Sequence, residues 1–166
     1  NFHTVEKIGG TSMSDYVAVR DNIILKPVHD QGLYQRIFVV SAYGGITNLL
    51  LEHKKNGQAG VYAEFANSVN DDTWQEALDK LKTEILAINK NLFGETKLAG
   101  EADAFILERL DDASRVLADL QRLCQHGHFA LDQHLSTVRE MLASIGEAHS
   151  AWNTAQLLQQ DGINAV

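Results

Sequence analysis

Cysteine and basic residues are scarce in this chain, and long apolar runs are absent from it. Its 166 residues include a single cysteine, Cys124, so no internal disulfide can form, and a lone thiol suits a reducing compartment such as the cytoplasm. No apolar stretch approaches the ~20 residues that a membrane-spanning helix needs, and no signal peptide is expected at the start. We therefore expect a cytoplasmic protein without membrane contact.

The charge balance is acidic. The chain carries 14 lysine and arginine residues against 22 acidic residues, a net charge of −8, and no polybasic run offsets it. Nucleic acid and anionic membranes are therefore poor partners. With 45% hydrophobic residues the chain can bury one core and a small second unit.

The most informative segment is a short apolar strand that runs into a lysine and two glycines. Residues 5–12 read VEKIGGTS. Paired glycines allow a tight turn and close approach of a ligand, so that successive N–H groups can face an anion, and Lys7 adds a full positive charge. The segment is not a P-loop, whose lysine follows its glycines, and it lacks the dinucleotide pattern GxGxxG. Taken alone, a purely structural glycine turn remains the alternative.

A second strand ends in the same way. Residues 36–40 read RIFVV and are followed by SAYGGITN at 41–48. In open α/β sheets ligands bind beyond the carboxyl ends of parallel strands. Two such turns side by side would form one polar crevice.

With a third block, SIGEAHSA at 144–151, these motifs resemble the signature of the aspartokinases of the amino-acid kinase superfamily, KFGGTS, VVSAxxGxTN and SxGE. Ile8 stands where the family usually has phenylalanine, and Tyr43 with Gly44 replaces a Met-Ser or Met-Gly pair. The first block, VEKIGGTSM, is similar to the branch of aspartokinases associated with ectoine synthesis in salt-tolerant bacteria. The three blocks bracket nearly the whole chain.

The resemblance implies a fold and a division of the chain. It implies an α/β fold, the N-terminal part of the three-layer αβα amino-acid kinase fold, with an incomplete sheet and a large helical insertion. Residues 1–56 and 143–166 would form the substrate side of the kinase domain, and 57–142 a helical segment with a long hairpin. The nucleotide-binding half would be missing, so the chain alone should be inactive.

The resemblance also implies a reaction and a site. Aspartokinases transfer the γ-phosphoryl group of ATP to the side-chain carboxylate of L-aspartate, giving 4-phospho-L-aspartate for amino-acid biosynthesis. Mg²⁺ would bridge the phosphate oxygens, and no residue of this chain is assigned as its ligand. Lys7 would be catalytic; the phosphates would be held by Lys7, Gly9, Gly10, Thr11 and Ser12, and L-aspartate by Ser41, Thr47 and Glu147. A carboxylate such as Glu147 suits an α-ammonium group.

The middle of the chain predicts long helices packed side by side. Apolar residues recur at alternating spacings of four and three in three runs. These runs are Trp74, Leu78, Leu81, Ile85, Ile88 and Leu92; Ile106, Leu110, Ala113, Leu117, Leu120 and Cys124; and Leu131, Leu135, Val138 and Leu142. The hairpin could be a lid or a dimerisation arm, or a helical layer covering the sheet, and we expect a homo-oligomer, such as a dimer.

Local signals predict where these helices begin and end. Thr73 with Glu76 reads as a capping box, Gly94 ends the first long helix, and Gly100 precedes the second. After Glu147 a helix with apolar positions Ala151, Ala155 and Leu158 is expected. A strand should begin at residues 163–166.

Other interpretations stay open. The segment CQHGH at 124–128 could be a metal site, but Gly127 reads better as a helix cap, and no second ligand cluster follows at a zinc-like spacing. One rival function is another amino-acid kinase, acting on glutamate, acetylglutamate or a nucleotide. The other is a non-catalytic helical interaction module whose glycine turns are only structural.

Overall fold

The computed structural model describes residues 3–26, 32–67, 71–127 and 129–166. The chain is a mixed α/β protein, mostly helical, and it divides into two compact units. The first unit comprises the residues up to 44 together with 147–166, and the second comprises 45–146.

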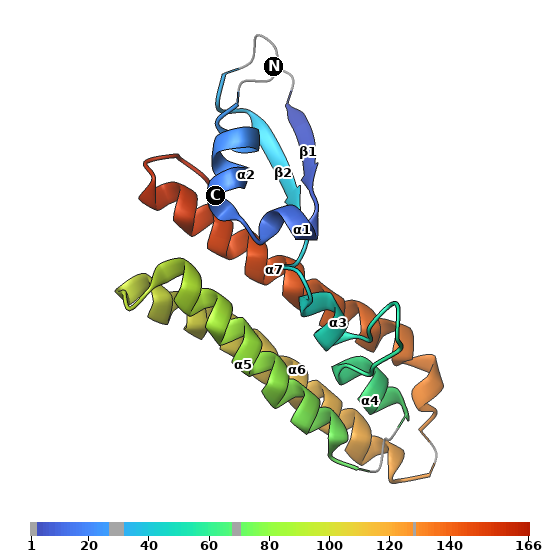
Figure 1. Cartoon of the computed structure of the whole chain (residues 1–166). Helices are drawn as coiled ribbons and strands as arrows, with labels where there is room; N and C mark the ends of the chain where they lie inside the picture. The colour runs from blue at the N-terminus through green and yellow to red at the C-terminus, as the bar shows by residue number, and fades with distance from the viewer. Residues whose placement is uncertain (1–2, 27–31, 68–70, 128) are drawn as a thin grey trace. The chain divides into compact units, whose positions relative to one another are not determined.

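The sheet of the first unit consists, within the described residues, of two parallel strands (Figure 1). Strand β1 (Thr4–Ile8) pairs with β2 (Arg36–Val40) in a register that runs from Thr4 opposite Arg36 to Ile8 opposite Val40. Both predicted strands are confirmed. Because Ile8 and Val40 are partners, the two glycine turns begin side by side at the same edge of the sheet.

Short helices connect the two strands. They are α1 (Gly10–Met13), α2 (Tyr16–Val19) and η1 (Arg20–Ile24), a π-helical turn. Alternation along the strands separates two faces. One face, with Glu6 and Phe38, is partly covered, whereas Val5, Ile37 and Val39 are exposed on the other.

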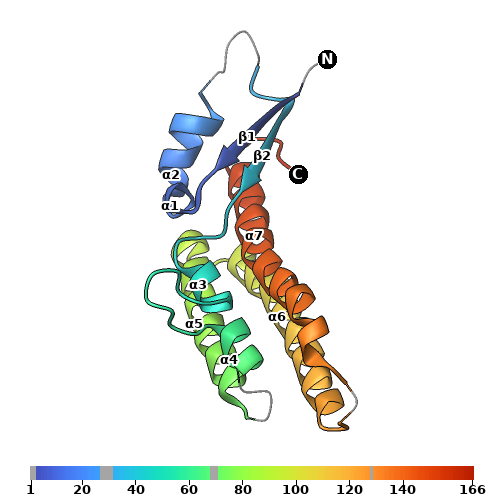
Figure 2. The ribbon, with the colours of Figure 1, turned by 90° about the vertical axis from the view of Figure 1, so that its right-hand side faces the viewer.

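The second unit is helical (Figure 2). It holds α3 (Ile46–Leu50), α4 (Val61–Asn67), α5 (Thr73–Phe93) and α6 (Lys97–Cys124), then η2 (Leu131–Gln133) and the first half of α7 (Leu135–Gln160). Helices α5 and α6 form an antiparallel hairpin, since polar bonds join Lys82 to Asp111, Asn89 to Asp103 and Gln121 to the carbonyl of Asp71.

The predicted boundaries of the hairpin were partly wrong. Gly94 does end α5, with a positive φ of 64°. The predicted capping box is wrong. Thr73 already lies within the helix, and its hydroxyl donates to the carboxylate of Asp71 instead of capping the helix. Gly100 lies inside α6, because the Thr96 hydroxyl caps the helix by accepting from the N–H of Ala99.

The predicted apolar stripes of α5 and α6 form the core of the hairpin, but the later positions of each stripe are less buried than the earlier ones. Trp74, Leu78, Leu81 and Ile85 are buried as predicted. Further along α5 the buried positions are Asn89 and Phe93, whereas Ile88 and Leu92 are only half-buried. A straight helix turns every 3.6 residues, so a stripe with a 3.5-residue period gradually leaves its buried face.

The second half of α7 departs from its predicted pattern. Ala151 is exposed, and the buried face is instead largely polar: His149, Ser150, Asn153 and Thr154. Residues 163–166 form no strand, although a strand was predicted there. Among the described residues, no helix has the length and apolarity that crossing a bilayer requires.

Candidate active site

The first glycine turn presents backbone amides at the end of β1. Gly9 is extended (φ −75°, ψ 158°) and precedes α1, and the N–H of Met13 donates to its carbonyl at 3.1 Å. The N–H groups of a first helical turn lack acceptors within the helix. Here that turn contains Thr11 and Ser12, both exposed, and Lys7 is exposed two residues before Gly9.

The second glycine turn extends β2. The N–H of Ser41 donates to the carbonyl of Ile8 at 3.1 Å, so the strand pairing continues one residue into the loop. Gly45 has a φ of 86°, a left-handed conformation that favours glycine, and α3 starts directly after it. Both glycine turns therefore open helices, as predicted.

The two loops touch each other. A Cβ added to Gly10 would lie 2.8 Å from the carbonyl oxygen of Ala42, so only glycine allows this approach. The hydroxyl of Ser14 accepts from the N–H of Gly44 at 3.3 Å and donates to the carbonyl of Gly10 at 3.5 Å. Ser14 thus bridges the first loop to the second.

Helix α7 reaches the second loop one turn after Glu147. The hydroxyl of Ser150 donates to the carbonyl of Ser41 at 2.7 Å and lies 3.2 Å from the carbonyl of Glu147. The Glu147 side chain is exposed. Two residues predicted to bind aspartate, Ser41 and Glu147, are therefore joined through one buried hydroxyl.

A buried polar layer lies between the second loop and α7. The ring of Tyr43 meets the ring of His149 edge to face, with centroids 5.2 Å apart, and Asn153 Nδ2 lies 3.1 Å from His149 Nε2. Burial raises the pKa of Tyr43 to about 12, although hydrogen bonds with Asn153 and Thr154 oppose the rise. Burial lowers the pKa of His149 to about 4, so both groups are neutral near pH 7.

The first unit thus contains seven of the eight residues predicted for the site. Thr47 is the exception, because it lies on α3 in the second unit. Ser14 and Ser150, which join the loops to each other and to α7, were not among the predicted site residues. The available signal for Ser150 was the polar run HSAWNT at 149–154 in a segment expected to be an amphipathic helix.

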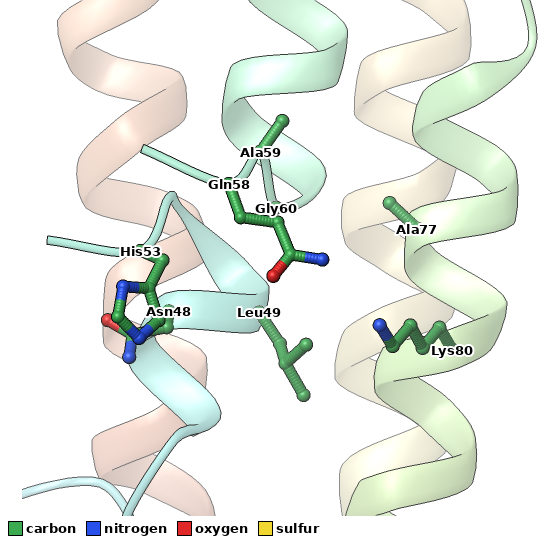
Figure 3. Close-up of a pocket in the computed structure, with 8 residues that line it drawn as sticks. All are labelled: Asn48, Leu49, His53, Gln58, Ala59, Gly60, Ala77 and Lys80. Atoms are coloured by element: carbon green, nitrogen blue, oxygen red, sulfur yellow. The ribbon is translucent and has the colours of Figure 1, made fainter. Parts of the chain in front are cut away.

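Neither of two described cavities is lined by the predicted site residues. A cavity of about 70 Å³ in the second unit lies between α5 and α3 with the segment that follows it, and its polar lining residues are Asn48, His53, Gln58 and Lys80 (Figure 3). A larger cavity of about 340 Å³ lies in the first unit between β2 and the end of α7, with Phe38 and Leu158 in its wall.

The described residues contain no group of three or more histidine, cysteine or acidic side chains that could hold a metal ion. Cys124 ends α6, and Gly127 has a φ of 75° in the turn after it. His128 lies outside the described residues.

Comparison with known proteins identifies a close relative. Over 163 residues, 98% of its length, the chain is 55% identical to a protein named aspartate kinase Ask_Ect from Stutzerimonas stutzeri (strain A1501). The chain spans 34% of that relative's length. No protein-family model matches the chain, and no solved structure matches it significantly.

Proposed function

Because this chain is homologous to an aspartokinase over nearly its whole length, as its motifs indicated, we propose that it forms the N-terminal, substrate-side part of an aspartate kinase. The whole enzyme would transfer the γ-phosphoryl group of ATP to the side chain of L-aspartate and serve the ectoine branch of aspartate metabolism. The remaining two thirds would hold the rest of the nucleotide.

The observation that carries the proposal is the meeting of three motifs at one edge of the sheet. Parallel pairing sets both glycine turns side by side, the Gly10 contact brings their backbones together, and Ser150 ties the second turn to the helix of Glu147. Three sequence blocks that lie far apart in the chain thus converge where open α/β sheets bind ligands.

Phosphoryl transfer to aspartate requires stabilisation of negative charge more than a general base. The aspartate side chain has a pKa of about 4, so the nucleophile is already ionised at neutral pH. The reacting groups are both anions, and the enzyme must align them and offset their charge. We assign that role to Lys7, with the amides of Gly9, Gly10, Thr11 and Ser12 holding the phosphates.

The carboxylate of Glu147 would hold the α-ammonium group of L-aspartate, while Ser41 and Thr47 would complete that subsite. Mg²⁺ would offset phosphate charge.

The first test is Lys7→Ala in the full-length enzyme. Loss of a charge-stabilising group commonly costs a hundredfold or more in rate, so we expect kcat to fall by at least about that factor. Aspartate-dependent ADP release measures it. Lys97→Ala, which removes an exposed lysine from α6, should leave kcat unchanged. A Lys7→Ala enzyme with near-normal turnover would overturn the assignment.

The second test separates substrate binding from chemistry. Glu147→Gln should raise the KM for aspartate by about tenfold or more, because a neutral amide loses the charge-assisted bond to the ammonium group, and should change the KM for ATP little. Glu140→Gln is a matched control, since Glu140 is exposed on the same helix two turns earlier. Equal effects of the two substitutions would contradict the role of Glu147.

The third test uses the 166-residue chain by itself. We expect no aspartate-dependent ATP turnover from it, because the proposed site holds phosphates and aspartate but not the rest of the nucleotide. Measurable aspartate-dependent ATP turnover by the 166-residue chain would contradict this division of the site.

A further inference from the structure

Serine and threonine hydroxyls in helix α7 differ in where they donate. Within helices such hydroxyls usually bond a carbonyl one turn earlier. Ser144 does so with Met141 at 2.8 Å, and Thr154 with Ser150 at 2.7 Å. Ser150 is different, because its shorter contact, 2.7 Å, leaves the helix for the carbonyl of Ser41, and its contact within the helix is longer at 3.2 Å.

The acceptor of this bond lies at the start of the second glycine loop. Ser41 is the first residue after β2, and its N–H is held by Ile8. With its carbonyl held as well, both backbone groups of Ser41 are fixed. A trans peptide points its C=O and the next N–H in opposite directions, so the bond from Ser150 also directs the N–H of Ala42 away from α7.

The surroundings of Ser150 make the loss of this hydrogen bond costly. Ser150 is fully buried, with no exposed surface, so a lost bond there is not replaced by bulk water. Next to it in the sequence, His149 packs against Tyr43 of the same loop. Ser14 holds the other end of the loop through the N–H of Gly44. Loop 41–45 is thus fastened at both ends by serine hydroxyls.

We propose that Ser150 is a positioning residue of the aspartate subsite: its hydroxyl fixes the carbonyl of Ser41, and with it loop 41–45, against the turn of α7 that carries Glu147. The inference rests on the proposed function, since it is the aspartate subsite that needs Ser41 and Glu147 at a fixed separation. Ser150 itself touches no substrate.

The expected signature is a change in one substrate's KM. Removing the hydroxyl frees the loop relative to Glu147 but leaves Lys7 and the first loop unchanged. In the full-length enzyme, Ser150→Ala should therefore raise the KM for aspartate by about five- to twentyfold, while the KM for ATP stays within twofold. A substitution that merely destabilised the fold would lower the amount of active enzyme and leave both KM values unchanged.

A matched pair isolates the hydroxyl from packing. Ser150→Thr keeps the hydroxyl and Ser150→Val removes it, and the two side chains have nearly the same size and branching, so any crowding in this buried position is common to both. We expect the KM for aspartate of the Thr variant to lie near that of the wild type, and that of the Val variant near that of Ser150→Ala. Thr83→Ala serves as a control, since the hydroxyl of this exposed threonine donates to the carbonyl of Asp79 in its own helix α5.

A second measurement reports on the loop directly. Amide hydrogen exchange in loop 41–45 should be faster in Ser150→Ala than in the wild type, whereas β1 should keep its protection. An unchanged KM for aspartate in Ser150→Ala, or equal values in the Thr and Val variants, would overturn the positioning role while leaving the proposed function intact. A wild-type enzyme without aspartate-dependent ADP release would overturn the proposed function itself, and with it this inference.

Discussion

Gly9 and Gly10 are neighbours in the first loop but have different surroundings. A Cβ on Gly9 would meet no atom within 4 Å and its φ of −75° is ordinary, whereas a Cβ on Gly10 would lie 2.8 Å from the carbonyl oxygen of Ala42. Of these two positions, the fold therefore requires glycine only at Gly10. The open space at Gly9 is where the proposed function places phosphate.

Substitution at these two glycines should separate stability from function. Gly10→Ala should lower the free energy of unfolding by about 1–3 kcal/mol, because the two loops must move apart. Gly9→Ala should stay within about 0.5 kcal/mol of the wild type and yet raise the KM for ATP in the full-length enzyme. Urea unfolding and steady-state kinetics measure the two effects. A Gly9→Ala enzyme with an unchanged KM would mean that phosphate does not approach this backbone.

The burial of His149 predicts a pH dependence. Its pKa is lowered from 6.5 to about 4 in the folded protein, so below pH 6.5 the unfolded chain binds a proton that the folded chain does not. Stability should therefore fall as the pH falls from 6.5 towards 4, by about 2 kcal/mol between pH 7 and pH 5. Urea unfolding at both pH values tests this.

The control for that experiment is His149→Gln, which cannot titrate. Carboxylates with lowered pKa values, such as Glu6 and Glu52, lose their stabilising charge only at lower pH, so they contribute little in this window. The variant should lose less stability than the wild type between pH 7 and pH 5. Equal losses would show that another group titrates.

At the scale of elements, the side chain of Arg36 links helix η1, which lies between the two strands in the chain, to strand β1. Its side chain is 2% exposed and makes paired bonds of 2.7 and 2.9 Å to Glu6, and it also donates to the carbonyls of Ile23 and Ile24 at the end of η1. These bonds hold the pKa of Glu6 below its usual value. One guanidinium thus satisfies both a strand residue and the last carbonyls of a helix.

Arg36→Lys should therefore be costly even though it keeps the charge. An ammonium group cannot reproduce the planar set of donors, and we expect a loss of about 2–4 kcal/mol in the free energy of unfolding. The comparison is Arg139→Lys, which alters a similar paired bond to Glu52 whose side chains are 42% and 33% exposed. There the loss should be below about 1 kcal/mol. Similar losses, measured by urea unfolding, would contradict the importance of burial.

The elements that could be predicted are those whose signal lies within one short segment. Both strands end in glycine turns, and the stripe from Trp74 to Ile85 follows a helical period, so periodicity and turn residues sufficed. The cap of α5 could not be predicted, because Asp71, Asp72 and Thr73 are all capping residues and only the folded geometry chooses among them. Nor could the bond of Ser150, since a helical serine can donate to its own helix or leave it.

At the scale of the whole molecule, the sheet keeps an uncovered face. Val5, Ile37 and Val39 are 68%, 51% and 49% exposed, and they lie on the face of the strands opposite Glu6 and Phe38. The sequence predicted an incomplete three-layer fold from the family resemblance, whereas composition alone could not reveal which face would be open. The proposed remainder of the enzyme would supply the layer that covers it.

The uncovered apolar face, together with the two strand edges that no described residue pairs, should make the 166-residue chain associate with itself, since burying such surface is favourable and strand edges pair readily. We expect its solution mass to rise above 18.4 kDa with concentration in sedimentation equilibrium. Ile37→Glu places a charge on the face and should return the chain to a monomer. Val116→Glu, a similar change at a 41% exposed position of α6, should have little effect. Dissociation by Val116→Glu alone would instead assign the contact to the helical hairpin. A wild-type chain that stays monomeric at all concentrations would contradict association by either surface.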